Sequence, residues 1–259
     1  MPDMKAPLKL GVNLWNQYTD WPRFLEAMIE ADELGYDSLF TWDHVYPIIG
    51  SWDGPALETY TAMAAVAAQT KRATIGHLVT ANTFRNPALV AKMITTIDHI
   101  SNGRAVLGMG AAWMEPEHTG FGLEFGDRPG TRLRWLEHSL KITTGMLAGE
   151  RPSSDEGDRY DVKEALNLPA PIQEKIPIMI GGSGPKVTLR LVAQYAVMNN
   201  LGNPIEPLVK SDAILREHCT RLGRDEKSIE RTVELQRVVI RDTREAALAR
   251  EAELLELNG

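Results

Sequence analysis

Two ionisable side chains, Asp43 and His44, stand next to each other at the end of a predicted strand, 38–43. A carboxylate beside an imidazole can fix the tautomer of the ring or raise its pKa, which suits a residue that takes or gives a proton. Adjacent strand residues point to opposite faces, so the two can cooperate only where the strand has turned into a loop. His44 is thus a candidate general acid or base, and a histidine that only caps the loop is the alternative.

A glycine-rich turn forms a second candidate site. The residues Gly181, Gly182, Ser183 and Gly184 follow a predicted strand, 176–180, and precede a predicted helix that begins near Pro185. Backbone amides in such a turn can converge on an anion, and the positive end of the helix points to the same place. We predict that a phosphate group binds here, and a plain strand-to-helix turn is the alternative.

A third cluster surrounds the end of the apolar strand predicted at 105–110. Gly108 and Gly110 would let a ligand approach the backbone closely, because they carry no side chain. Trp113 and Glu115 follow, and Trp15 stands at the end of the first predicted strand. We predict that these three side chains line a substrate pocket, although core packing for the tryptophans and a solvated loop charge for Glu115 remain alternatives. Glu117, two positions on, is likewise expected to be a solvated loop charge.

The elements that must position these residues alternate regularly along the chain. Apolar runs and helical periodicity predict one domain over residues 1–259, with an irregular excursion at about 150–175 that carries a small hairpin around Tyr160. Parallel neighbours need crossover helices, so the alternation predicts a parallel sheet. The predicted strands are 8–15, 38–43, 73–79, 105–110, 176–180, 196–201 and 232–240, and the predicted helices are 21–34, 57–69, 87–100, 131–147, 185–194, 207–222 and 244–257.

Two α/β architectures fit this order of elements. An open doubly wound sheet usually has a glycine fingerprint after its first strand, and residues 11–15 offer none. We therefore predict a TIM (β/α)8 barrel with its site at the carboxyl ends of the strands. Only seven strand-helix units are found, so the eighth unit is expected to be absent from this chain.

Composition limits the partners of the protein. The 259 residues carry a formal charge of −7 with no basic block, which argues against nucleic acid. The single cysteine, Cys219, and histidines without partners at ligand spacing indicate no metal site. No apolar run is long enough to span a membrane, and residues 1–10 lack the apolar core of a signal peptide. We expect a cytoplasmic protein that acts on a small molecule.

Four segments at characteristic spacings show a family resemblance that covers most of the chain. They are 33–44, 75–80 with 85–87, 101–110 and 177–185. On these segments the chain resembles the luciferase-like monooxygenase superfamily, and within it the deazaflavin-dependent oxidoreductases that use coenzyme F420. The resemblance implies a barrel of the bacterial luciferase type.

The resemblance also implies a chemistry and a set of contacts. A deazaflavin has carbon where FMN has its reactive nitrogen, so it moves hydrides and resists oxygen chemistry. The implied reaction is hydride transfer between C5 of F420 and a small organic substrate, with His44, assisted by Asp43, as the proton-transfer residue. The resemblance places a non-proline cis peptide at Leu78-Val79. The implied cofactor-binding residues are Leu78, Val79, Thr80, Gly108, Gly110, Gly181, Gly182, Ser183 and Gly184.

Two other functions stay open, and neither the substrate nor the direction of hydride transfer is fixed by the sequence. One is an FMN-dependent monooxygenase on the same barrel. The other is a carrier that binds a flavin or deazaflavin without turnover, which the absent eighth unit and the unusual sixth strand, 196–201, would suit. A homodimer is expected in each case.

Overall fold

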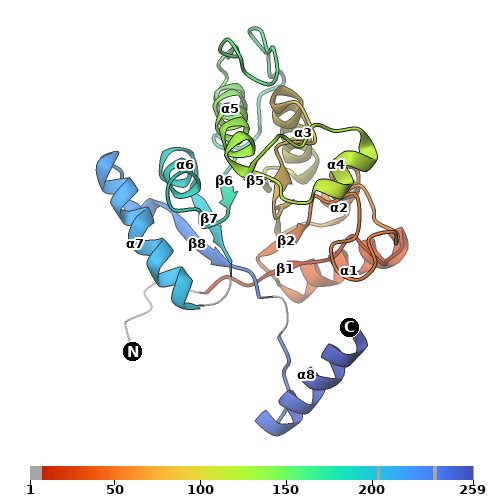
Figure 1. Cartoon of the computed structure of the whole chain (residues 1–259). Helices are drawn as coiled ribbons and strands as arrows, with labels where there is room; N and C mark the ends of the chain where they lie inside the picture. The colour runs from red at the N-terminus through yellow and green to blue at the C-terminus, as the bar shows by residue number, and fades with distance from the viewer. Residues whose placement is uncertain (1–7, 203–204, 236–237, 259) are drawn as a thin grey trace.

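A computed structural model describes residues 8–202, 205–235 and 238–258. Their strands form one curled parallel sheet in the order β1-β2-β3-β5-β6-β7-β8 (Figure 1). The short strand β4 follows β3 along the chain and also pairs with β5. The predicted parallel sheet of seven strand-helix units is confirmed. The strands are β1 (Gly11–Asn13), β2 (Ser38–Thr41), β3 (Thr74–His77), β4 (Thr80–Ala81), β5 (Ala105–Gly110), β6 (Ile178–Gly181), β7 (Met198–Leu201) and β8 (Glu230–Val233).

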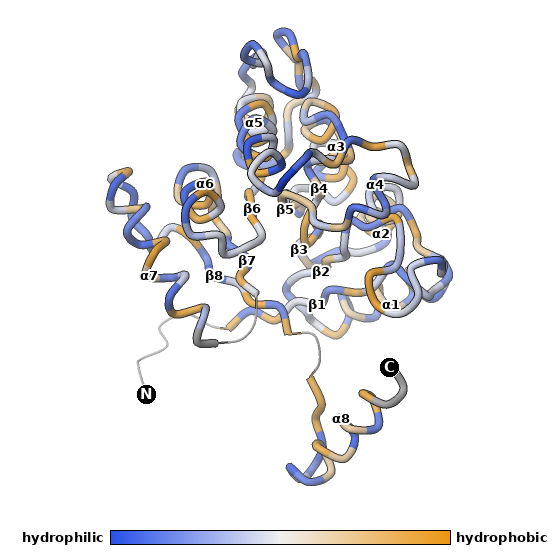
Figure 2. Tube along the Cα trace, in the orientation of Figure 1, coloured by the Kyte–Doolittle hydropathy of each residue, from blue (hydrophilic) through white to orange (hydrophobic). Residues whose placement is uncertain are grey.

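Most of the helices lie around the outside of this sheet, and their apolar faces form with it one continuous core (Figures 1 and 2). This is the arrangement of a (β/α) barrel, as predicted. The short helix α4 and the 3-10 turn η1 were not predicted. The helical elements are α1 (Trp21–Leu34), α2 (Thr59–Gln69), α3 (Pro87–Ser101), α4 (Glu115–Phe121), α5 (Pro129–Leu147), α6 (Thr188–Tyr195), α7 (Ile205–Arg221), η1 (Glu226–Ser228) and α8 (Arg244–Asn258).

The helix α3 shows how local sequence fixes an element. The side chain of Asn86 accepts a hydrogen bond from the amide of Ala88, and Pro87 occupies the first turn. Val90, Ile94 and Ile97 recur at helical spacing and are buried, so the helix presents one apolar face to the core. The helix ends at Asn102, whose φ of 57° is left-handed. The helix predicted at 87–100 is therefore confirmed. It could be predicted because all of its signals are local in the sequence.

The barrel is open between its first and last described strands. β8 pairs with β7 from Glu230 to Val233, and no backbone pairing joins it to β1 within the described residues. Side chains cross this seam instead: Lys9 Nζ lies 3.1 Å from Glu230 Oε2, and Asn13 Nδ2 lies 2.5 Å from Glu234 Oε1. The open seam fits the prediction that an eighth unit is absent from this chain.

The predicted strand 232–240 is wrong in its bounds. β8 spans Glu230–Val233 because β7 ends at Leu201, opposite Val233, and offers no further backbone partner. Val238 and Ile240 are instead 68% and 79% exposed, and residues 236–237 lie outside the described part of the chain. The apolar residues in this stretch made it resemble a buried strand.

The helix predicted at 244–257 is present as α8, and it stands apart from the barrel (Figure 1). Hydrophilic and hydrophobic residues are mixed along it (Figure 2). Leu248 and Leu255 are both more than half exposed. Among the helices of the described residues, none is both long and apolar enough to cross a membrane.

The excursion after α5 contains no regular strand from 150 to 175, so the predicted hairpin around Tyr160 is wrong. One side chain closes a loop there: Ser154 Oγ donates to the carbonyl of Tyr160, and the Ser154 amide donates to the carbonyl of Val162. Val162 is buried against Ile142 and Met146 of α5. The loop is therefore held to α5 by packing and by the contacts of Asp155 with Lys141 and of Asp158 with His138, and not by a ladder of strand pairs.

Candidate functional site

The third strand is interrupted at the mouth of the barrel. β3 ends at His77, the peptide between Leu78 and Val79 is cis, and β4 begins at Thr80. The cis peptide implied by the family resemblance is therefore present. Leu78 and Val79 are only partly buried, and both pack against the apolar cluster inside the barrel.

The Val79 side chain lies over three glycines at the ends of β5 and β6. A Cβ at Gly110 would stand 2.6 Å from Val79 Cγ2, and a Cβ at Gly181 would stand 3.0 Å from the same atom. At Gly108 it would meet the His77 carbonyl oxygen and, at 3.1 Å, Val79 Cγ1. Gly108 and Gly110 are fully buried. A ligand was predicted to approach the backbone at these two glycines. Val79 occupies the space beside them instead.

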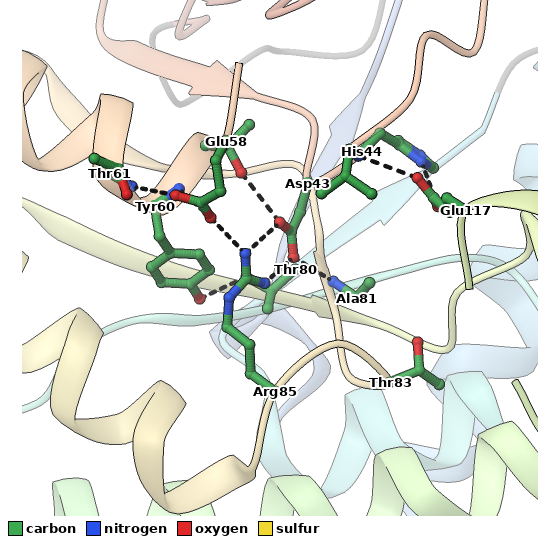
Figure 3. Close-up of polar contacts among 12 residues, drawn as sticks. Asp43, His44, Glu58, Tyr60, Thr61, Thr80, Ala81, Thr83, Arg85 and Glu117 are labelled. Carbon is green, nitrogen blue, oxygen red and sulfur yellow. Dashed lines mark hydrogen bonds and ion pairs between the residues drawn. The ribbon is translucent and has the colours of Figure 1, made fainter. Parts of the chain in front are cut away.

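His44 faces a partner that the sequence did not reveal. Its Nδ1 lies 2.9 Å from Oε1 of Glu117, and Glu117 Oε2 accepts a hydrogen bond from the amide of Val45 (Figure 3). The Glu117 side chain is 1% exposed and that of His44 is 14% exposed. Because Glu117 can only accept when ionised, Nδ1 carries the proton of the neutral ring, and Nε2 presents its lone pair.

Glu117 was expected to be a solvated loop charge, and that expectation is wrong. It lies on α4, which the sequence analysis did not recognise because the helix has only seven residues. Pro116 at the first turn was the local signal that could have revealed it. Contact with His44 could not be read from the sequence, because 73 positions separate the two residues.

The Asp43 carboxylate makes no hydrogen bond to the His44 ring. It belongs instead to a buried network with Arg85 on the other side of the chain (Figure 3). Its carboxylate accepts two hydrogen bonds from Arg85, at 2.7 and 3.1 Å, and others from the Thr59 hydroxyl and the Ala81 amide. The second guanidinium nitrogen also reaches Glu58 at 2.6 Å. Asp43 therefore ties the end of β2 to β4 and α2, directly beside the residue that carries the imidazole.

Glu58 also caps α2, since its carboxylate accepts from the amides of Tyr60 and Thr61. Burial tends to raise the pKa of Glu58, but the hydrogen bonds from Thr61 and the charge of Arg85 outweigh it and hold this pKa below its usual value. Arg85 lies 4.5 Å above the centroid of the Tyr60 ring. The network thus combines charge pairing, a helix cap and a cation–π contact.

Thr80 belongs to the layer beneath the mouth. Its side chain is completely buried, and its Oγ1 lies 2.8 Å from the hydroxyl of Tyr60. His77 stacks on the same ring with centroids 4.0 Å apart. Burial raises the pKa of Tyr60 and lowers that of His77, so both stay uncharged. The structure thus places Thr80 in the support of the mouth.

The two predicted pocket tryptophans lie at different places on the rim. Trp15 stacks on Trp42 with centroids 5.2 Å apart and is 38% exposed. Trp113 lies edge-on to His44 with centroids 5.5 Å apart and is 63% exposed. Glu115 is exposed on α4. Trp113 is therefore the one of these three predicted pocket residues that the structure places against the imidazole.

A carboxylate at the seam was also missed by the sequence analysis. Glu234 follows β8, and its Oε1 accepts hydrogen bonds from Asn13 Nδ2 and from Trp42 Nε1 at 3.3 Å. It fixes the indole of Trp42 and so the ring on which Trp15 stacks. No local pattern around residue 234 marks it, because both partners lie about 200 positions away.

The glycine-rich turn is exposed from Gly182 to Lys186. Gly182 has a φ of 111°, a conformation that favours glycine, and its amide donates to the carbonyl of Asn200. The buried Asn199 side chain donates to the carbonyls of Ile180 and Gly182 and holds the turn from below. α6 starts at Thr188, later than predicted, and has no side-chain cap. The amide of Leu189, in the first turn of α6, donates to the carbonyl of Gly184.

The helix α4 is anchored by a buried histidine. His118 Nδ1 donates to the carbonyl of Met114, and Nε2 accepts from the hydroxyl of Thr83, each at 2.7 Å. Burial lowers the pKa of His118, which keeps the ring neutral in this arrangement. The ring also packs on Phe84 and Phe125. This anchor fixes the helix that carries Glu117.

Comparison with known proteins identifies the class. The sequence pattern of the luciferase-like monooxygenase family matches residues 8–257, so the chain belongs to that family. A solved structure of an F420-dependent secondary alcohol dehydrogenase, in complex with an F420-acetone adduct, superposes with a TM-score of 0.77 at 22% sequence identity. The match covers 87% of this chain and 68% of that one, and supports the fold.

Curated relatives carry two kinds of name. An F420-dependent glucose-6-phosphate dehydrogenase of Microbacterium testaceum is 34% identical over 194 residues, which are 74% of this chain and 56% of the relative. The pyrimidine monooxygenase RutA of Variovorax paradoxus is 31% identical over 177 residues, which are 68% of this chain and 44% of the relative. The chain thus spans about half the length of these relatives.

Proposed function

We propose that the protein is an F420-dependent oxidoreductase that transfers a hydride between C5 of the deazaflavin and a small organic substrate. The observation that carries this proposal is the His44–Glu117 pair at the mouth, a buried carboxylate fixing an imidazole whose other nitrogen is free for a substrate proton. Relatives named as F420-dependent dehydrogenases support the choice of cofactor.

The role of His44 follows from its hydrogen bond. With Nδ1 donating to Glu117, Nε2 is the atom that accepts a proton from a substrate hydroxyl or, once protonated, returns it. The ionised Glu117 stabilises the imidazolium that results, as the carboxylate does in other acid–base triads. The Trp113 ring beside the imidazole limits the directions from which a substrate can reach Nε2.

The residues at the mouth fit a flat cofactor with a phosphorylated tail. When bound, F420 supplies hydride chemistry without oxygen activation. We propose that Leu78 and Val79 contact its ring system, since both lie partly exposed at the mouth. We assign its phosphate to the exposed turn of Gly182, Ser183 and Gly184 beside the uncapped start of α6. Gly108, Gly110 and Thr80 would act from beneath, since all three are buried.

Binding and turnover can be tested in two steps. Purified protein is titrated separately with F420 and with FMN while fluorescence is recorded. We expect saturable binding of F420 and weaker binding of FMN. A clear preference for FMN would favour a monooxygenase, as the relative RutA is named, and would contradict the proposal.

Deazaflavin absorbance at 420 nm is then followed with alcohols, imines and enones. We expect His44→Ala to bind F420 within a few-fold of wild type and to lose roughly 100-fold or more in turnover. Unchanged turnover would remove His44 from the mechanism, and binding without any turnover would indicate a carrier. A homodimer and a cytoplasmic location are further parts of the proposal, checked by light scattering and by cell fractionation.

A further inference from the structure

A shallow, open hollow lies on α4, on the face that does not carry Glu117. Its volume is about 520 Å³. Four of its residues fall at positions 115, 116, 119 and 120, which share one side of a helix. The hollow is lined by Tyr46, Trp52, Glu115, Pro116, Thr119 and Gly120.

Aromatic rings meet at this hollow nearly at right angles. The Tyr46 and Trp52 rings are 6.3 Å apart at their centroids, with planes inclined by 75°. Phe121 lies behind, 5.6 Å from Tyr46. Gly120 makes room for the phenol, because a Cβ there would collide with the Tyr46 hydroxyl. Trp52 remains 53% exposed, so a ring face is available to a guest.

The charged side chain that lines the hollow is negative. Glu115 is its one ionisable carboxylate, and no lysine, arginine or histidine lines it. Within the described residues Glu115 makes no hydrogen bond or ion pair, and its charge acts at longer range on Arg132, which is stacked 3.9 Å over Phe125. The hollow therefore combines electron-rich ring faces with a carboxylate that has no direct partner among the described residues.

We propose that this hollow binds an organic ammonium group, held by the faces of Tyr46 and Trp52 and by the carboxylate of Glu115. Cations over aromatic faces are attracted by the ring quadrupole, and perpendicular rings surround a rounded ammonium better than a flat guest. A neutral apolar group would gain nothing from Glu115, and an anion would be repelled by it. The site is separate from the proposed hydride transfer, because Glu117, which contacts His44, does not line the hollow.

The proposal is tested by calorimetric titration of the full chain with choline and with 3,3-dimethylbutan-1-ol, its neutral isostere. We expect saturable binding of choline and at least tenfold weaker binding of the alcohol. Glu115→Gln and Trp52→Ala should each weaken choline binding at least tenfold, and Trp52→Phe should weaken it less than Trp52→Ala does. Glu156→Gln, which removes an exposed charge in the excursion, serves as the matched control and should bind like wild type.

Three outcomes would overturn the proposal. One is equal binding of the two probes, which would show that shape alone is recognised. Another is the absence of saturable heat with choline. The third is that a second copy of the chain covers the hollow. Sedimentation would show this if Trp52→Ala changes the oligomeric state and choline does not bind. None of these measurements needs F420 or turnover, so the proposed function stands or falls separately.

Discussion

His44 Nδ1 and Glu117 Oε1 lie 2.9 Å apart, and the carboxylate is also fixed by the amide of Val45. The loop after β2 and the helix α4 are therefore joined at the atom that sets the tautomer of the imidazole. A change at either residue should alter proton transfer while the barrel stays intact.

Glu117→Gln keeps the shape of this contact and removes its charge. We expect turnover to fall roughly 100-fold or more, because an amide neither stabilises the imidazolium nor guarantees the tautomer. Steady-state rates measure the loss.

The control for this prediction is Glu124→Gln, which removes an exposed carboxylate shortly after α4. Its rate should match that of the wild type. A Glu117→Gln protein with unchanged turnover would show that the carboxylate serves only to hold the helix.

Arg85→Ala should destabilise the protein strongly. It leaves Asp43, whose side chain is 1% exposed, without its cation, and loss of one partner of a buried pair costs about 3–5 kcal/mol. Adding Asp43→Asn removes the uncompensated charge, so the double variant should lose less than the sum of the two single losses. Urea denaturation gives the free energies of unfolding. Additive losses would show that the two side chains are not coupled.

Gly110→Ala should disturb the mouth. The new Cβ would lie 2.6 Å from Val79 Cγ2, and overpacking of this kind costs about 1–3 kcal/mol. Val79→Ala in the same chain should restore much of that loss, because it removes the colliding methyl group. Gly130→Ala is the matched control: no atom lies near its Cβ position in α5, so helix propensity should leave it neutral or stabilise it by up to about 1 kcal/mol. Failure of Val79→Ala to rescue would contradict the packing described.

Stability should fall as pH drops through about 6.5, the ordinary histidine value. Burial lowers the pKa of His77 and of His118 in the folded protein. Below about pH 6.5 the unfolded chain therefore binds more protons than the folded chain, and protonation favours unfolding. Glu58 has a lowered pKa as well, but its contribution is lost only below about pH 4.5. Melting temperatures from pH 7.5 to 5 should decrease in wild type and decrease less in His118→Gln. If the melting temperatures of wild type and His118→Gln fall in parallel, His118 does not contribute to the pH dependence of stability.

The order of strands and helices was readable because each element carries its own signal. Asn86-Pro87 and Asn102 bound α3, and Ala105–Gly110 is apolar throughout. The cis peptide at Leu78-Val79 followed from family resemblance, since nothing in the chemistry of leucine and valine requires it. Short or unpaired segments were misjudged, because the end of β8 depends on how far β7 extends.

The site was only half readable, for a different reason. His44 and the glycine-rich turn were predicted as site residues from their residue types and their places after predicted strands. The role of Glu117 was missed because its partner is distant in sequence. Gly108 and Gly110 were predicted to leave space for a ligand, but Val79, between β3 and β4, occupies that space. Side-chain neighbours across a barrel are set by packing, which a single sequence does not display.

The seam between β8 and β1 has a consequence for how the protein behaves at high concentration. Strands with free peptide groups at a sheet edge are templates for pairing with other chains, and charged side chains at such edges discourage that aggregation. Lys9 and Glu230 are such charges, and they neutralise one another across the seam. Replacing both with apolar residues should therefore lower solubility well before it lowers the melting temperature.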